Sequence, residues 1–256
     1  MLHPRAVCCA LMLALVALGC GALGSTGAGP QFRGKEVRPD EFTLILLRTG
    51  DLLPSAPDAR IKRTMEEHYE FMDRLAADGS LLVAGPFGND KAATDLRGLF
   101  VLDGASVDIS TTLAAQDPMT SGGFFRQEAY PLIALDFIRW LPEMSLELDA
   151  ERARAGQDPS NPVLGDFVVM IARDGKAAFA ACTHEALASK VVLLGRVGGA
   201  LDGALFGIFD ATDPGEIRAR LTVAGMEMGA DPVQGEGLEL SQWMATPALR
   251  RLSQGD

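Results

Sequence analysis

The order of apolar segments between residues 41 and 141 constrains the fold of this chain more than any other feature. Short apolar runs predict four β-strands, at 42–49, 81–84, 96–102 and 124–135. Apolar residues at three- and four-residue spacing, together with capping residues, predict two helices, at 58–77 and from about 106 to 116. The predicted order is therefore strand, helix, strand, strand, helix, strand.

This order is typical of a ferredoxin-like (βαββαβ) unit, in which both helices cover one face of an antiparallel sheet. The pattern recurs in the second half, with strands predicted at 167–172, 191–195, 204–209 and 238–244. A weaker helix is predicted at 177–189, and Asp213-Pro214 predicts the start of another helix that reaches about residue 228. One alternative is left open, in which the stretch 173–176 is a hairpin turn and 177–181 is a strand.

His68 is the candidate functional residue of the first predicted helix. It belongs to the stripe that is expected to face the sheet, which consists of Ile61, Met65, Met72, Leu75 and Ala76. A histidine in such a stripe is either a packed core residue with one hydrogen bond or a group presented to a cavity between helix and sheet. Periodicity favours the core residue.

Asp117 is the second candidate. Because proline disfavours helical geometry in the residue before it, Asp117 should lie just past the end of the second helix, with its side chain free. It can cap the turn before Gly122-Gly123, or it can accept a hydrogen bond from His68 and leave the other imidazole nitrogen to move a proton. The sequence alone does not choose between these roles.

The first twenty residues resemble a secretory signal: Arg5, an apolar run at 6–18, and small residues around Cys20. The sequence of 17–20 also resembles a lipobox, which would leave Cys20 as an acylated N-terminus attached to the membrane. Lipoprotein and plain secreted protein are equally supported. Beyond this segment we expect a flexible tether at 21–40, a first domain at 41–145, a linker at 146–162 and a second domain at 163–250.

Composition excludes several kinds of function. The formal net charge of −11 would repel a phosphate backbone, so nucleic acid is not an expected partner. Cys182 is the one cysteine outside the signal segment, so neither an internal disulfide nor a cysteine-based metal site is expected. His68 has no second ligand at helical spacing, and because His68 and His184 are the remaining histidines of the mature chain, a multi-histidine metal centre is not expected. No metal and no cofactor is predicted, and no phosphate-binding glycine loop is present.

The chain resembles the YCII-related (YciI-like) family. The residues that carry the resemblance are His68 in the first helix, the stretch Leu81-Leu82-Val83-Ala84-Gly85-Pro86, and Asp117-Pro118 followed by Gly123. The resemblance covers about residues 41–141 and, in degraded form, 163–245. It implies a ferredoxin-like α+β fold that associates as a dimeric α+β barrel, with a His and Asp pair in a pocket. Related members act on small cyclic or unsaturated acids as dehydrochlorinases or isomerases.

Carried over, the resemblance makes His68 and Asp117 the catalytic pair and places Gly85 and Pro86 among the substrate-binding residues. Arg48 is expected either to hold a substrate carboxylate or to form an exposed salt bridge. Members of the family are usually single-domain and cytoplasmic, whereas this chain is expected to be exported and doubled. We therefore expect the two halves to pack as an intramolecular version of the family dimer, giving an α+β fold of two ferredoxin-like domains.

The second half departs further from the family pattern. Asp231 fits it, but His184 lies 11 residues before Gly195, whereas His68 lies 17 before Gly85. The predicted function is acid–base chemistry of a lyase, isomerase or hydrolase type on a small molecule. The alternatives are a non-catalytic ligand-binding or scaffold module of the cell envelope and, with less support, an oxygenase of the α+β barrel type.

Overall fold

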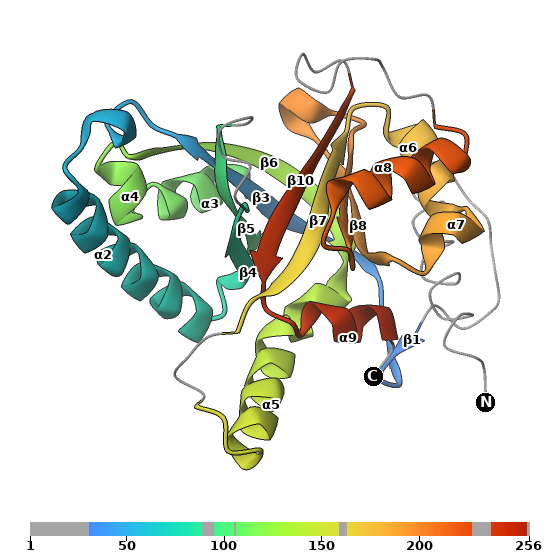
Figure 1. The fold of residues 1–256 in the computed structure, drawn as a ribbon, viewed down its shortest axis with the longest axis horizontal. Helices are drawn as coiled ribbons and strands as arrows, with labels where there is room; N and C mark the ends of the chain where they lie inside the picture. The colour runs from blue at the N-terminus through green and yellow to red at the C-terminus, as the bar shows by residue number, and fades with distance from the viewer. Residues whose placement is uncertain (1–30, 89–94, 105, 159–162, 227–236, 255–256) are drawn as a thin grey trace.

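In the computed structural model, one eight-stranded antiparallel sheet organises the chain (Figure 1). The structure describes residues 31–88, 95–104, 106–158, 163–226 and 237–254. The predicted signal segment, Cys20 and Asp231 lie outside these residues. Within the described ranges, no helix combines the length and the hydropathy that crossing a bilayer requires.

The first half has the predicted order of elements. They are β3 (Pro39–Thr49), α2 (Asp58–Ala77), β4 (Leu81–Pro86), β5 (Leu96–Asp103), α3 (Val107–Ala114), the short α4 (Pro118–Ser121) and β6 (Phe125–Leu135). The strands lie in the order β6-β3-β5-β4, which is the ferredoxin-like arrangement. The stretch Gly85-Pro86 does not end the second strand but belongs to it.

The second half repeats this topology. Its elements are β7 (Gly165–Ala172), α6 (Gly175–Thr183), α7 (Glu185–Ala188), β8 (Val191–Val197), the 3-10 turn η3 (Gly199–Leu201), β9 (Leu205–Phe209), α8 (Pro214–Val223) and β10 (Leu238–Ala245). Their strand order is β10-β7-β9-β8. The hairpin alternative for 173–176 is wrong, because Asp174 accepts a 2.9 Å hydrogen bond from the Ala177 N–H and starts a helix there.

The two units join edge to edge at two seams. At one seam β6 pairs with β8, from Leu132 opposite Val197 to Ala134 opposite Gly195. At the other, β4 meets β10: Phe87 bridges to Trp243, and the Trp243 indole Nε1–H donates a 2.9 Å hydrogen bond to the Gly85 carbonyl. The sheet therefore closes into a barrel, and the predicted pseudo-dimer of two ferredoxin-like units is confirmed.

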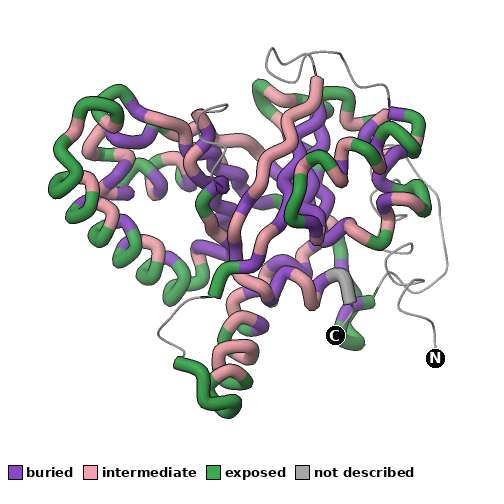
Figure 2. The backbone as a smooth tube through the Cα atoms, viewed as in Figure 1, coloured by how far each residue is buried: buried purple, intermediate pink, exposed green. Residues whose placement is uncertain are grey.

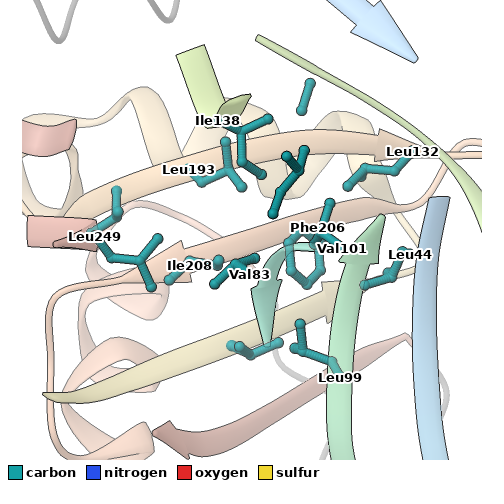
Figure 3. Packing of buried hydrophobic residues seen from close by; sticks show 14 of the residues in the cluster. Leu44, Val83, Leu99, Val101, Leu132, Ile138, Leu193, Phe206, Ile208 and Leu249 are labelled. Atoms are coloured by element: carbon teal, nitrogen blue, oxygen red, sulfur yellow. The ribbon is translucent and has the colours of Figure 1, made fainter. Parts of the chain in front are cut away.

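The interior of the barrel is one apolar core built by both units. Figure 3 shows side chains of this core from both halves, including Leu44 and Val101 of the first and Leu193 and Phe206 of the second. Strands β3, β5, β7, β8 and β9 are mostly buried and β6 and β10 are mostly half-buried, whereas the outer faces of α2 and α8 are exposed (Figure 2). Burial of this shared interior binds the halves together, because neither unit can cover its inner sheet face alone.

The two units also share a bulge. The register of β4 against β5 shifts between Leu81 and Val83, and that of β8 against β9 shifts between Val191 and Leu193. These positions coincide when Leu81-Leu82-Val83-Ala84-Gly85 is placed over Val191-Val192-Leu193-Leu194-Gly195. The similarity of these two stretches therefore corresponds to a shared local geometry.

Helices close one end of the barrel. After β6 the chain forms the 3-10 turn η2 (Asp136–Trp140) and α5 (Leu141–Arg154), and the last described helix is α9 (Leu249–Gln254). Leu141, Met144 and Leu249 of these helices belong to the interior core. The prediction of a linker at 146–162 is wrong for 146–154, which belong to α5. Its charged composition reflects an exposed helix rather than an extended chain.

The prediction of a flexible tether at 21–40 is wrong for its second part. Residues 31–36 form a small hairpin of β1 (Gln31–Phe32) and β2 (Lys35–Glu36), and β3 begins at Pro39. Phe32 is buried, and its ring stacks on Trp140 with 5.3 Å between ring centroids. Composition missed this because two buried side chains, Phe32 and Val37, anchor an otherwise polar segment.

Candidate functional site

Helix α2 places His68 against the sheet. The buried residues of this helix are Thr64, His68, Phe71 and Leu75, while Ile61, Met65 and Met72 pack at the margins of the same core. The predicted stripe was therefore right for His68 and Leu75. It was wrong for Ala76, which is exposed, and it omitted Phe71.

Asp117 lies just past the end of α3, as predicted, and it also starts the short helix α4. It is the N-cap of α4, and its Oδ1 accepts a 3.1 Å hydrogen bond from the Met119 N–H. Its Oδ2 accepts a 3.0 Å hydrogen bond from the Thr120 hydroxyl. Asp117 is fully buried, so these donors offset part of the cost of removing the carboxylate from water.

The two candidate residues are in contact. His68 Nδ1 lies 2.7 Å from Asp117 Oδ1, although 49 positions separate them in the chain. An ionised carboxylate can only accept hydrogen bonds, so we assign the proton of this hydrogen bond to Nδ1 of His68. Asp117 thus caps α4 and orients the imidazole at once, and the two roles left open by its sequence coexist.

The imidazole lies in an aromatic environment between α2 and the sheet. Its centroid is 6.0 Å from the ring of Phe100 on β5 and 5.9 Å from the ring of Phe125 on β6. Tyr69 lies on the solvent side at 5.6 Å. The His68 side chain is 7% exposed, and its Nε2 has no hydrogen-bond partner among the described residues. Nε2 is therefore the atom of the pair that is free to exchange a proton.

Arg48 lies on the other face of the sheet. Leu44 and Leu46 of the same strand belong to the barrel interior, whereas Ile45 and Leu47 belong to the core beneath α2. Arg48 lies on the same face of β3 as Leu44 and Leu46, toward the barrel interior. Its Nη1 lies 2.5 Å from Asp95 and its Nε 2.7 Å from Glu128.

These ion pairs shift the pKa values of both the basic and the acidic partner. Burial acts to lower the pKa of Arg48, but hydrogen bonds to Glu128 and Asp95 outweigh it and raise that pKa. Burial acts to raise the pKa of Asp95, and Arg48 together with Arg126 holds it below its usual range. Of the two roles expected for Arg48, the structure therefore contains the salt bridge.

Gly85 and Pro86 occupy the seam between the two units. The Gly85 carbonyl accepts the hydrogen bond from Trp243, and a Cβ at Gly85 would lie 1.8 Å from the Met244 carbonyl oxygen. Pro86 pairs with Gly98 and is exposed. Neither residue has a hydrogen bond to His68 or Asp117 within the described part of the chain. The glycine is required for barrel closure.

The second unit has no described counterpart of the pair. His184 is exposed, and its Nδ1 accepts a 3.2 Å hydrogen bond from the Ala186 N–H at the start of α7. Cys182 is fully buried, and burial raises the pKa of its thiol to about 12. Among the described residues, no group of three or more His, Cys, Asp or Glu side chains is placed to hold a metal ion.

Sequence reasoning missed the short helix that holds the carboxylate. The signal was present, because Asp117-Pro118 is the same cap-and-proline start that correctly predicts α8 at Asp213-Pro214. Thr120, whose hydroxyl donates to Asp117, is the third residue of α4. Phe100 carried no such signal, because β5 is buried on both faces, and Phe125 is an apolar residue at the start of the largely polar first part of β6.

The fold and the pair define a class: an α+β barrel of two ferredoxin-like units, one of which holds a buried His and Asp contact. Residues 48–133 match the family model of the YCII-related domain, and both His68 and Asp117 lie inside the match. The resemblance of this part of the chain to the YCII-related family is thereby confirmed. A comparison with curated proteins found no similar sequence.

Among solved structures, the chain is similar to three variants of chlorite dismutase from Candidatus Nitrospira defluvii. The identities are 12%, 10% and 9%, with TM-scores of 0.48, 0.46 and 0.47. The similarity covers 85–86% of this chain and 95% of each of those chains. It is a distant similarity of fold.

Proposed function

We propose that this protein is a small-molecule enzyme that uses His68 as a general acid or base and Asp117 to orient it. The observation that supports the proposal is the 2.7 Å contact between Nδ1 and Oδ1, combined with an Nε2 that has no partner among the described residues. With Nδ1 protonated and held, Nε2 can accept a proton from a substrate carbon or hydroxyl. Returning it to another atom of the substrate completes an isomerisation, and delivering it to a leaving group completes an elimination.

The neighbourhood of the pair supports a weakly polar substrate. The rings of Phe100 and Phe125 flank the imidazole, and Arg48 lies on the opposite face of β3. A substrate carboxylate would therefore not meet Arg48 and Nε2 together. We expect the reacting part of the substrate to be uncharged and apolar around the labile C–H or O–H bond.

Replacing His68 by glutamine is expected to reduce proton transfer by about 10²–10⁴-fold, which is the usual contribution of one positioned acid or base. The purified protein would be incubated in D₂O with a set of small unsaturated and carbonyl compounds, and ¹H NMR would follow loss of each C–H signal. His184→Gln is the matched control, because His184 is an exposed helix cap. Exchange that is equal in wild type and His68→Gln for every compound would contradict the proposal.

A second candidate function is a non-catalytic ligand-binding or scaffold module. The burial of His68, with 7% of its side chain exposed, favours it, because a core imidazole can simply satisfy a buried carboxylate. Nitrogen-correlated NMR of the imidazole separates the two functions. A compound that both changes the Nε2 signal and loses a C–H proton by exchange supports the enzyme, whereas compounds that change the Nε2 signal without exchange, or none that change it, support the binding or scaffold module.

We also propose that the protein is exported and that Cys20 can carry a lipid anchor. The support is the charged, apolar and small-residue order of 1–20. In a bacterial expression host, metabolic labelling with a fatty acid is expected to label the wild-type protein and not Cys20→Ser. Unlabelled protein in the periplasmic fraction would indicate plain secretion, and full-length protein in the cytoplasm would contradict export.

A further inference from the structure

The barrel has one end closed by helices and one end lined by charged side chains. Side chains of α5 and α9 fill the end where β3 and β7 begin. At the opposite end, β3 and β7 finish and their antiparallel partners β6 and β10 begin (Figure 1). We call this second end the barrel mouth. It carries Arg48, Glu128 and Tyr130 of the first unit and Arg173, Glu239 and Ser241 of the second.

Four of these side chains, those of Glu128, Tyr130, Glu239 and Ser241, lie on the inner face of the barrel, whereas Arg173 follows the end of β7 and is exposed. Tyr130 is directly opposite Leu44, and Glu128 is directly opposite Leu46. In the second unit, Glu239 is opposite Ile171 and Ser241 is opposite Val169. All four apolar partners belong to the interior core. Because directly opposite residues of an antiparallel pair project from the same face, the polar side chains project inward too.

The charges of the first unit are matched within that unit. Arg48 lies between Asp95 at 2.5 Å and Glu128 at 2.7 Å, and the Tyr130 hydroxyl donates a 3.1 Å hydrogen bond to Glu128. The Arg48 side chain is 20% exposed and the Glu128 side chain 31%. These residues are therefore in contact with solvent, but their charges are already paired within the first unit.

The charges of the second unit are not matched. Within the described residues, neither the Glu239 carboxylate nor the Arg173 guanidinium forms a hydrogen bond or an ion pair. The backbone brings them together, because the Arg173 N–H donates a 2.6 Å hydrogen bond to the carbonyl of Gly237, two residues before Glu239. Burial raises the pKa of Glu239, and Arg48 and Arg173 act against this rise, while Asp95 and Glu128 add to it. The Ser241 Oγ atom is also buried without a partner in the described part of the chain. A half-buried carboxylate and a buried hydroxyl that lack partners are costly, which calls for an occupant.

We propose that the barrel mouth binds a small zwitterion of the α-amino acid type, with its ammonium group on Glu239 and its carboxylate on Arg173. A free acid and a free base that stand near each other without pairing are complementary to a ligand carrying both charges. Because the six charges of the mouth, Arg48, Arg126, Arg173, Asp95, Glu128 and Glu239, sum to zero, a ligand without net charge keeps that balance. Ser241 offers a further polar contact to the ammonium group. This site does not depend on His68 or Asp117.

The test uses three probes that differ in charge alone: glycine, methylammonium and acetate. NMR titration of the full chain would follow the backbone amides of Gly237, Glu239 and Ser241. Glycine is expected to bind at least about tenfold more tightly than either singly charged probe, since each lacks one ion pair. Bound glycine should also lower the pKa of Glu239, because a nearby cation favours the carboxylate.

Variants distinguish this site from its alternatives. Glu239→Gln and Arg173→Gln are each expected to weaken glycine binding about tenfold, whereas the exposed controls Glu185→Gln and Arg154→Gln should leave it unchanged. Equal affinity for the three probes, or glycine binding that survives both Glu239→Gln and Arg173→Gln, would overturn the proposal. Absence of glycine shifts at millimolar glycine would overturn it as well.

Discussion

Replacing Gly85 by alanine is expected to lower the free energy of unfolding by about 4 kcal/mol and the melting temperature by about 10 °C. The added Cβ would lie 1.8 Å from the Met244 carbonyl oxygen and 2.9 Å from the Trp243 Nε1 atom. Both neighbours belong to β10, so the seam between β4 and β10 must open to accept it. The hydrogen bond from Trp243 to the Gly85 carbonyl is then lost. Urea denaturation would measure the change.

Gly195 provides the matched control, because it lies at the equivalent seam between β8 and β6. A Cβ there would lie 2.6 Å from a terminal methyl group of Leu132, which can rotate away, and 3.2 Å from the nearest backbone oxygen. Gly195→Ala is therefore expected to cost about 1 kcal/mol, at the low end for added core volume. Equal losses in the two variants would show that the seams do not differ, and would contradict closure of the barrel through β4 and β10.

Replacing Asp117 by alanine is expected to lower the free energy of unfolding by about 3 kcal/mol, because two buried donors and one part-buried donor lose their acceptor. The carboxylate is fully buried and accepts hydrogen bonds from His68, Met119 and Thr120. The typical penalty for such groups is about 1–3 kcal/mol each before relaxation. Thermal or urea denaturation measures the loss. Nitrogen-correlated NMR should show that His68 also loses its preference for the tautomer protonated at Nδ1.

Asp213→Ala is the control for the capping part of this effect. Asp213 begins α8 in the same way, followed by Pro214, but it is exposed, and its side chain caps the helix through a 2.8 Å hydrogen bond from the Gly215 N–H. Loss of an exposed N-cap costs about 1 kcal/mol, which leaves a difference of about 2 kcal/mol between the variants. This difference represents the buried contact with His68. If both variants lost the same amount, Asp117 would be a helix cap and no more.

Much of the fold was predictable because its signals are local. Helix α2 begins and ends at the predicted residues, since its amphipathic spacing and the Asp78-Gly79 stop act within a few positions. The order of strands and helices in each half followed from apolar runs in the same way. The errors fell where local composition was misleading, as in the charged end of α5 and in the segment that Phe32 anchors.

The candidate site was predictable only in part. Periodicity placed His68 on the buried side of its helix. The period of two along a strand also puts Arg48 on the same side of β3 as Leu44 and Leu46. Periodicity could not tell which face of β3 points into the barrel and which faces α2, because β3 is buried on both faces. The sequence-based hypothesis placed Arg48 in the same site as His68, and the structure puts them on opposite faces of the sheet. The charged mouth was not predicted at all, since its residues come from both units.

Short-range patterns of apolar and capping residues were thus enough to specify two ferredoxin-like units, because each element depends on neighbours a few positions away. Three properties arose from folding instead: closure of the sheet at Gly85 and Trp243, the meeting of His68 with Asp117, and the unmatched charges at the barrel mouth. Each depends on contacts between residues distant in the chain, and the strength of such contacts is set by burial and distance. Neither quantity is written in the local sequence.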